Sequence, residues 1–233
     1  MIRGEPLTAI IPARSGSKGI PGKNLYEIDG ENLVERTIRL AKNNSNVDNI
    51  IVTTDDPEIY KIAQNNDAAP PNLRPKHLST DTALTIDAVK HVLKDSNIQA
   101  GYVLLLQVTT PLRTDDDLHN LLKKFEDHPE ADAIVSVVNH NSPHPEKLLR
   151  QSGDFIIPYL GKNPGVPRQT LQSLYALNGA FYLTSFQIIH DESTLLPEKT
   201  IPFVMPQERS VNLDEPIDII VLEAILEKRI RDG

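Results

Sequence analysis

Residues 7–24, LTAIIPARSGSKGIPGKN, join an apolar run to a loop that carries three glycines and three cations. The apolar run, residues 7–13, predicts a buried strand. Glycines let backbone N–H groups approach an anion closely, and Arg14, Lys18 and Lys23 add positive charge. In sheets built from alternating strands and helices, ligands bind beyond the carboxyl ends of the strands, which is where this loop lies. The stretch therefore predicts an anion-binding loop after the first strand.

Two familiar phosphate-binding motifs do not match this loop. Its glycines are spaced G-x-x-G-x-x-G, which differs from the G-x-G-x-x-G fingerprint of dinucleotide-binding sites. A Walker loop requires Ser or Thr directly after its lysine, and Asn24 stands there instead. The alternative is a solvated turn in which basic residues happen to cluster.

Strand and helix patterns alternate along the following part of the chain. Asp56 and Pro57 form an N-cap and first-turn pair, and Thr114 caps a second helix. Apolar strands interleaved with helices predict an α/β fold, a doubly wound, mostly parallel sheet of the Rossmann-like nucleotidyltransferase type. The expected helices are 32–41, 57–63, 80–94 and 114–125, and the expected strands are 49–54, 102–107 and 133–138.

Residues 139–177 break this pattern. The segment 139–167 is rich in Asn, His, Pro and Gly and has no long helical periodicity, so we expect it to leave the sheet as a small β arm. Strands are expected again at 179–184 and 200–205, followed by an amphipathic helix at 217–230. The prediction is a single domain, residues 1–233, with 139–177 as its arm.

Composition narrows the class of protein. The 233 residues carry a formal net charge of -8 and no cysteine. The negative charge argues against nucleic acid as a partner, because nucleic-acid binding needs a basic surface. The lack of cysteine excludes disulfides, thiolate metal sites and cysteine nucleophiles. The first apolar run is too short for a secretion signal or a membrane span, so we expect a cytoplasmic protein without a membrane partner.

The loop at residues 10–24 resembles the signature of the CMP-sialic acid synthetase family, the cytidylyltransferases that activate nonulosonic acids. In that family an Ile-Pro-Ala-Arg loop ending in Lys-Asn follows the first strand. The resemblance runs nearly end to end. The other segments that carry it are RPKHLSTDT at 74–82, LLQVTTPLR at 105–113, PRQ at 167–169, NGA at 178–180 and SVNLDEPID at 210–218.

The resemblance implies transfer of CMP from CTP to the anomeric 2-hydroxyl of a nonulosonic acid, a nine-carbon 2-keto sugar acid, with release of pyrophosphate and dependence on Mg²⁺. It also implies a homodimer, in which the arm packs against the second subunit. The implied nucleotide-binding residues are Arg14, Lys18, Lys23, Asn24, Arg74 and Thr85. The implied catalytic residues are Lys23, Arg14 and Asp214, the sugar-binding residues are Gln107, Arg168 and Asn178, and the metal ligands are Asp214 and Asn212.

Two positions depart from the family pattern. Val108 replaces a proline, and Asn212 replaces the first of two aspartates that hold magnesium in the family. Residues i and i+2 of a strand share a face, so Asn212 and Asp214 are still expected to converge on one cation. Magnesium needs only one or two protein carboxylates beside substrate phosphates, and a weaker metal site is the prediction.

Several alternatives stay open. The acceptor is sialic acid, legionaminic acid or a related diamino acid, and Ala176 and Leu177 before Asn178 favour legionaminic acid. The eight-carbon acid Kdo is a rival acceptor. From a different class, Asn212 would suit a nucleotide- or sugar-binding module without turnover. No side chain stands out as the general base, and Asp214 and metal-bound hydroxide are equal alternatives.

Overall fold

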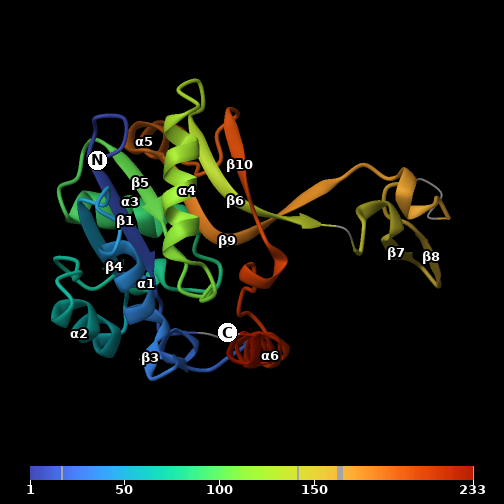
Figure 1. The fold of residues 1–233 in the computed structure, drawn as a ribbon, viewed down its shortest axis with the longest axis horizontal. Coiled ribbons are helices and arrows are strands. Elements are labelled where there is room, and N and C mark those ends of the chain that lie inside the picture. The colour runs from blue at the N-terminus through green and yellow to red at the C-terminus, as the bar shows by residue number, and fades with distance from the viewer. Residues whose placement is uncertain (17, 141, 162–164, 233) are drawn as a thin grey trace.

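The computed structural model describes residues 1–16, 18–140, 142–161 and 165–232. In this part of the chain a central six-stranded sheet has the order β10-β6-β9-β5-β1-β4 (Figure 1). Its strands are β1 (Leu7–Pro12), β4 (Asn49–Thr53), β5 (Tyr102–Leu105), β6 (Ala133–His140), β9 (Leu174–Ser185) and β10 (Thr200–Met205). β1 pairs in parallel with β4 and β5, and β10 pairs in parallel with β6. The predicted mostly parallel sheet is confirmed.

One strand runs against the others. β9 is antiparallel to both of its neighbours, β5 and β6. It is also longer than the predicted 179–184, because its first residues continue the pairing with the far end of β6: His140 lies opposite Leu174 and Asn139 opposite Tyr175. The sequence pattern gave no direction for this strand.

The helices cover both faces of the sheet. They are α1 (Leu33–Lys42), α2 (Pro57–Asn65), α3 (Thr85–Asp95), α4 (Asp115–Glu126), α5 (Phe186–Glu192) and α6 (Pro216–Asp232). Ala9 and Ile11 of β1 pack into a core with α1 and α4, whereas Ile10 points into a second core with α3 and α5. This alternation of adjacent side chains between two buried cores produces the doubly wound fold.

Helix starts follow local chemistry at two of the predicted caps. The Asp56 side chain accepts a hydrogen bond from the Glu58 backbone N–H, with Pro57 in the first turn of α2. Thr114 and Asp117 form a capping box at the start of α4. The prediction for α3 was wrong at its start. The helix begins at Thr85 rather than at residue 80, because residues 80–83 form a turn closed by the Ala83 N–H, which donates to the Thr80 carbonyl oxygen.

Short elements complete the fold. The 3₁₀ turns are η1 (Lys23–Leu25), η2 (Lys76–Leu78), η3 (Pro145–Lys147), η4 (Arg168–Thr170) and η5 (Gln207–Arg209), and a two-stranded ladder joins β2 (Glu27–Ile28) to β3 (Glu31–Asn32). Within the described residues, no helix combines the length and the apolar character that crossing a membrane requires.

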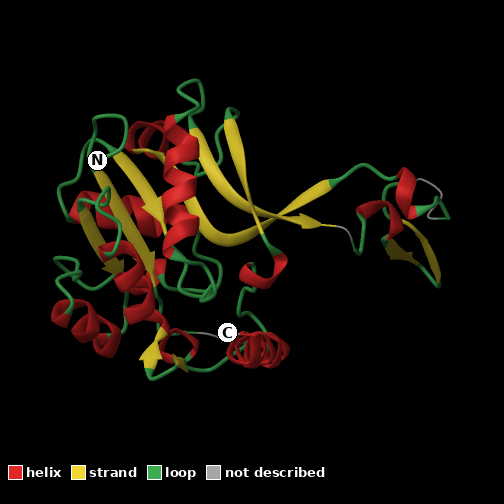
Figure 2. Cartoon of the chain, in the orientation of Figure 1, coloured by secondary structure: helices red, strands yellow, loops and turns green. Residues whose placement is uncertain are grey.

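The ends of β6 and β9 extend away from the body as a twisted ribbon, which carries a hairpin of β7 (Leu149–Ser152) and β8 (Phe155–Pro158) (Figures 1 and 2). This arm lies within the predicted segment 139–177. Its hairpin buries little apolar surface, and Phe155 and Ile156 are 75% and 69% exposed. The single domain and the role of the arm in a dimer both stay predictions.

Candidate active site

A cavity of about 320 Å³ lies beyond the carboxyl ends of β1 and β5. The loop after β1, the segment after β5 and the start of α3 all contribute to its wall. Predicted site residues in the lining are Arg14, Lys23, Asn24, Arg74, Thr85 and Gln107. The structure therefore brings these six together at the edge of the sheet where a ligand was expected.

Lys23 is the most firmly held of the loop cations. It is the first residue of η1, which follows Gly22 in a left-handed conformation at φ 67°. Its side chain is only 13% exposed, and Nζ lies 3.1 Å from Asp214 Oδ1. Nζ also donates to the Leu213 carbonyl oxygen at 2.6 Å. These contacts fix the charge of Lys23 at the point where the loop after β1 meets the segment before α6.

Gly19 allows the same two segments to touch. A Cβ at this residue would lie 1.9 Å from the carbonyl oxygen of Asp214, so no other residue fits without moving one of the two backbones. The glycine that the sequence suggested for approach to an anion thus serves close approach of Asp214.

Asn24 fixes the beginning of the loop. Its buried side chain donates from Nδ2 to the Arg14 carbonyl oxygen at 2.8 Å. The contact ties the two ends of the loop together and orients the residue that carries the first cation. Asn24 lines the cavity, but its amide N–H donates to the protein backbone rather than pointing a free donor at a ligand.

Arg14 and Lys18 share one carboxylate. Arg14 Nη2 lies 2.9 Å from Asp81 Oδ1, and Lys18 Nζ lies 2.5 Å from Asp81 Oδ2. Lys18 is 85% exposed and Asp81 is 43% exposed, so this group lies at the solvent side of the cleft. The hydrogen bond from Lys18, followed by that from Arg14, lowers the pKa of Asp81.

Arg74 carries a charge that the protein does not satisfy. Its side chain is 5% exposed, and within the described part of the chain Nε and Nη2 have no hydrogen-bond partner. Asp55 Oδ1 lies 3.8 Å from Nη2, close enough for charge attraction only. Burial lowers the pKa of Arg74, against the opposing effect of Asp55. A buried guanidinium with free donors in a cavity wall is suited to an anionic or carbonyl-bearing ligand.

Asp55 links Arg74 to the loop. Its two carboxylate oxygens accept hydrogen bonds from the Ser15 backbone N–H at 3.0 Å and from Ser15 Oγ at 2.7 Å. Burial acts to raise the pKa of Asp55, but the hydrogen bonds from Ser15 outweigh it and the pKa is lowered. Asp55 was not predicted as a site residue, although its place two residues after β4, at the carboxyl edge of the sheet, was a usable signal.

Of the three predicted sugar-binding residues, the structure places Gln107 in the cavity wall and Asn178 in the protein interior. Gln107 lines the cavity and lies against Gly179, where a Cβ would be 2.4 Å from Gln107 Oε1 and where φ is +77°. Asn178 is buried: Oδ1 accepts from Ser136 Oγ, and Nδ2 donates to Ser210 Oγ at 2.9 Å. Its side chain thus supports the segment before α6, and a contact with sugar stays a prediction. The backbone of Arg168 begins η4, and its side chain lies outside the described residues.

Asn212 and Asp214 do meet, but not on a strand. They lie in an irregular segment between η5 and α6, where the Leu213 N–H bonds to the Thr109 carbonyl oxygen rather than to a neighbouring strand. Asn212 Nδ2 donates to Asp214 Oδ2 at 2.5 Å. Asp214 is 62% exposed, and among the described residues Asn212 Oδ1 is buried without a partner.

The exposed carboxylate of Asp214 is the kind of oxygen ligand that magnesium takes beside phosphates and water. Asn212 would add its Oδ1 if its amide, which turns its NH₂ group toward Asp214, rotated. The described residues contain no cluster of three or more His, Cys, Asp or Glu side chains that would hold a metal alone. A metal at Asp214 therefore needs the substrate's oxygens to complete its ligands.

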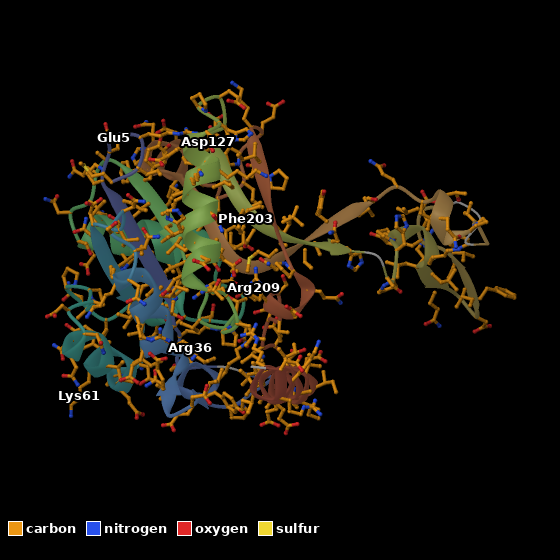
Figure 3. The ribbon with its side chains drawn as sticks, in the orientation of Figure 1. Glu5, Arg36, Lys61, Asp127, Phe203 and Arg209 are labelled. Atoms are coloured by element: carbon orange, nitrogen blue, oxygen red, sulfur yellow. The ribbon has the colours of Figure 1, made fainter. Side chains whose placement is uncertain are left out.

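A further ion pair holds this segment in place. Arg209, at the end of η5, points toward α4 (Figure 3) and binds Asp117 through two hydrogen bonds of 2.9 Å each. Asp117 is the buried carboxylate of the capping box at the start of α4. The pair joins the helix start to the approach to Asp214. The cap at Thr114 was predicted from the sequence, but the bond from Arg209 to Asp117 was not.

Comparisons with known proteins show the family to which the chain is related. A family model described as Cytidylyltransferase matches residues 8–153. The chain is 33% identical over 214 residues to an N-acylneuraminate cytidylyltransferase of Streptococcus agalactiae, covering 91% of this chain and 51% of that protein. It is 30% identical over 235 residues to a CMP-N,N'-diacetyllegionaminic acid synthase of Legionella pneumophila, covering 95% and 96% of the two chains. The chain spans about half the length of the streptococcal relatives.

Solved structures share the fold at lower identity. A structure titled as CMP:2-keto-3-deoxy-manno-octonic acid synthetase complexed with CTP aligns with a TM-score of 0.68 at 18% identity, covering 96% of this chain and 99% of that chain. A 4-diphosphocytidyl-2C-methyl-D-erythritol synthase aligns with a TM-score of 0.63 at 14% identity, covering 95% and 98%. Together with the family match over more than half of the chain, the fold and the cleft lead to one conclusion: this chain belongs to the cytidylyltransferase family.

Proposed function

We propose that this chain transfers CMP from CTP to the anomeric 2-hydroxyl of a nonulosonic acid, giving a CMP-sugar and pyrophosphate. The observation that carries the proposal is the cavity wall: Lys23 and Arg74 present partly or fully buried positive charge at the carboxyl edge of the sheet. Transfer of a phosphoryl-type group needs positioning and charge neutralisation more than covalent help from the protein.

The nucleotide occupies the cavity in this proposal. Lys23 neutralises charge that develops on the α-phosphate or on the leaving pyrophosphate, and Arg14 and Lys18 hold the outer phosphates. The free donors of Arg74 bind an acceptor of the nucleotide, and Thr85 offers a hydroxyl at the start of α3 to the cytidine part. Asn24 positions Arg14, because its side chain donates a hydrogen bond to the Arg14 carbonyl oxygen.

Asp214 and Asn212 are the residues that would hold Mg²⁺. The exposed carboxylate of Asp214 and the unpartnered Oδ1 of Asn212 supply two oxygen ligands. When bound, the ion neutralises phosphate charge during transfer. The Lys23 ammonium, 3.1 Å from Asp214 Oδ1, orients this carboxylate from the protein side.

The acid substrate lies beside Gln107, whose amide is fixed against Gly179. Arg168 supplies the second sugar contact in this proposal, since a guanidinium pairs with a carboxylate through two hydrogen bonds. A relative that matches over 96% of its own length is named for the synthesis of CMP-N,N'-diacetyllegionaminic acid, and this supports legionaminic acid over sialic acid as the acceptor. A Kdo acceptor has support from the shared fold alone.

The arm gives a reason to expect a homodimer. Its exposed side chains include the large apolar residues Phe155, Ile156, Tyr159 and Leu160, on a segment that projects from the body. A second copy of the chain would bury these side chains. Light scattering over a tenfold range of concentration tests the dimer, and a monomer mass throughout would remove it from the proposal.

The decisive assay measures pyrophosphate release from CTP and Mg²⁺ with N-acetylneuraminic acid, diacetyllegionaminic acid and Kdo offered separately. We expect release with a nine-carbon acid and its loss in Lys23→Met. Release with Kdo alone would replace the proposed acceptor class. Tight binding of CTP without release for any acid would support a binding module and overturn the proposed activity.

A further inference from the structure

Each of the four cations of the cleft lies within 4 Å of one of three carboxylates. Lys23 contacts Asp214, Arg74 lies near Asp55, and Arg14 and Lys18 share Asp81. A triphosphate that binds these cations brings its own negative charge, so the carboxylates already in place affect how tightly it binds.

The three carboxylates differ in what else holds them. Asp55 is fixed by the backbone and the hydroxyl of Ser15. Asp214 accepts from Asn212 as well as from Lys23. Asp81, by contrast, has no hydrogen-bond donor other than Arg14 and Lys18 in the part of the chain that the structure describes. Its position depends on the two cations alone.

The local structure permits Asp81 to move away from these cations. It lies in a turn between η2 and α3, outside any helix or strand, and its side chain is 43% exposed. Among the described residues, turning the side chain toward solvent breaks no other contact of its carboxylate and creates no buried unpaired charge. Phosphate oxygens make the same charge-assisted hydrogen bonds to guanidinium and ammonium groups as a carboxylate does.

We propose that Asp81 is a placeholder carboxylate, which competes with the phosphates of the nucleotide for Arg14 and Lys18 and so limits the affinity of the cleft for triphosphate and pyrophosphate. The inference rests on the proposed function, because it takes these cations as the phosphate-binding ones. Before CTP binds, Asp81 orders the Arg14 and Lys18 side chains through its ion pairs. These pairs break when the phosphates of CTP bind the two cations, and they form again when pyrophosphate leaves. The residue thus favours release of the product at the cost of some affinity for the substrate.

Direct binding of pyrophosphate tests this role without any turnover. Isothermal titration of the purified chain with pyrophosphate, in the absence of Mg²⁺ and sugar acid, compares the wild type with Asp81→Asn. We expect the variant to bind pyrophosphate roughly three- to tenfold more tightly, since two exposed ion pairs no longer compete. In the transfer assay, inhibition by pyrophosphate strengthens by the same factor and KM for CTP falls.

A matched control separates this effect from a general change in charge. Asp87→Asn removes the same charge from the exposed first turn of α3, where the structure gives its side chain no contact with the loop cations. We expect its affinity for pyrophosphate to stay within about twofold of the wild type, because an exposed charge without a direct contact to the loop cations is screened by solvent and salt. In a Lys18→Met background the gain from Asp81→Asn shrinks, since one of the two competing pairs is already gone.

Unchanged or weaker pyrophosphate binding in Asp81→Asn, with the same melting temperature as the wild type, overturns the inference. So does an equal gain in Asp87→Asn. Failure of the proposed function is a separate result: the wild type would then release no pyrophosphate from CTP with any acid, whatever the titrations show. Tighter binding in Asp81→Asn alone supports the placeholder role in either case.

Discussion

The two sides of the cleft hold their charges in different ways. On the inner wall, formed by Lys23, Asn24 and Arg74, side chains are buried or nearly so. Backbone and carboxylate contacts fix Lys23 and Asn24, while Arg74 keeps donors that have no partner among the described residues. On the outer rim, formed by Lys18 and Asp81, the side chains are largely exposed and contact other charged side chains. Fixed charges at low exposure act strongly on a transition state, whereas exposed pairs contribute little. Chemistry is therefore expected from the inner wall and adjustment of affinity from the outer rim.

The largest effect is expected at Lys23. Replacing it with methionine keeps most of the side-chain volume but removes the charge that the Leu213 and Asp214 contacts hold in the cleft. We expect kcat to fall by roughly a hundredfold or more, because the transferred charge loses its fixed neutralising group. Steady-state transfer assays measure the loss. A fall of less than threefold would mean that the inner wall does not carry the chemistry.

A second variant tests whether the close approach of the two loops matters. In Gly19→Ala the added Cβ overlaps the Asp214 carbonyl oxygen, so the loop or the segment before α6 must shift. Displacement of catalytic groups costs rate, and we expect roughly a tenfold loss of kcat/KM. Gly16→Ala is the steric control, since a Cβ at that glycine, which lines the cavity, meets no protein atom within 4 Å. An equal loss of kcat in both variants, measured at saturating CTP, would contradict the argument.

Substitution at the proposed metal ligands is expected to increase activity rather than reduce it. Asn212→Asp adds a second carboxylate beside Asp214 and restores the residue type of the family pattern. More ligand charge strengthens binding of a hard cation, so the Mg²⁺ concentration for half-maximal activity should fall roughly three- to tenfold. Activity titrated against Mg²⁺ gives the value. No change would remove Asn212 from the metal site.

The smallest effect is expected at the outer rim. Lys18→Met removes a cation that is 85% exposed, and its solvent-screened contact contributes little to binding. We predict KM for CTP to rise by about threefold or less with kcat unchanged. Initial rates over a range of CTP concentrations separate the two constants. A loss of kcat as large as that of Lys23→Met would mean that the outer rim contributes to the chemistry as much as the inner wall does.

Local chemistry determined what could be predicted of the fold. The caps at Asp56 and Thr114 depend on hydrogen bonds within one turn, and the alternating cores of β1 follow from the two-residue period of a strand. The antiparallel course of β9 depends on pairing with both β5 and β6, which no local pattern encodes. The start of α3 was misplaced because residues 80–83 form a turn in place of the first helical residues, and the helical periodicity of the sequence does not distinguish the two.

The candidate site shows the same division. Its loop cations and its place beyond β1 could be predicted, because residue types and strand order specify them. The contacts of Asp81, Asp55 and Asn178 were not predicted, since each joins segments that are far apart in the sequence. Asn178 illustrates the difference: its motif indicated a sugar contact, while its buried amide bonds Ser136 and Ser210.

One measurement tests the central claim most directly: ³¹P NMR of a reaction of the chain with CTP, Mg²⁺ and the acid that stimulates pyrophosphate release. The account predicts a CMP phosphodiester and pyrophosphate in equal amounts, both absent with Lys23→Met. Free CMP with pyrophosphate would mean hydrolysis of CTP rather than transfer, and would contradict the account.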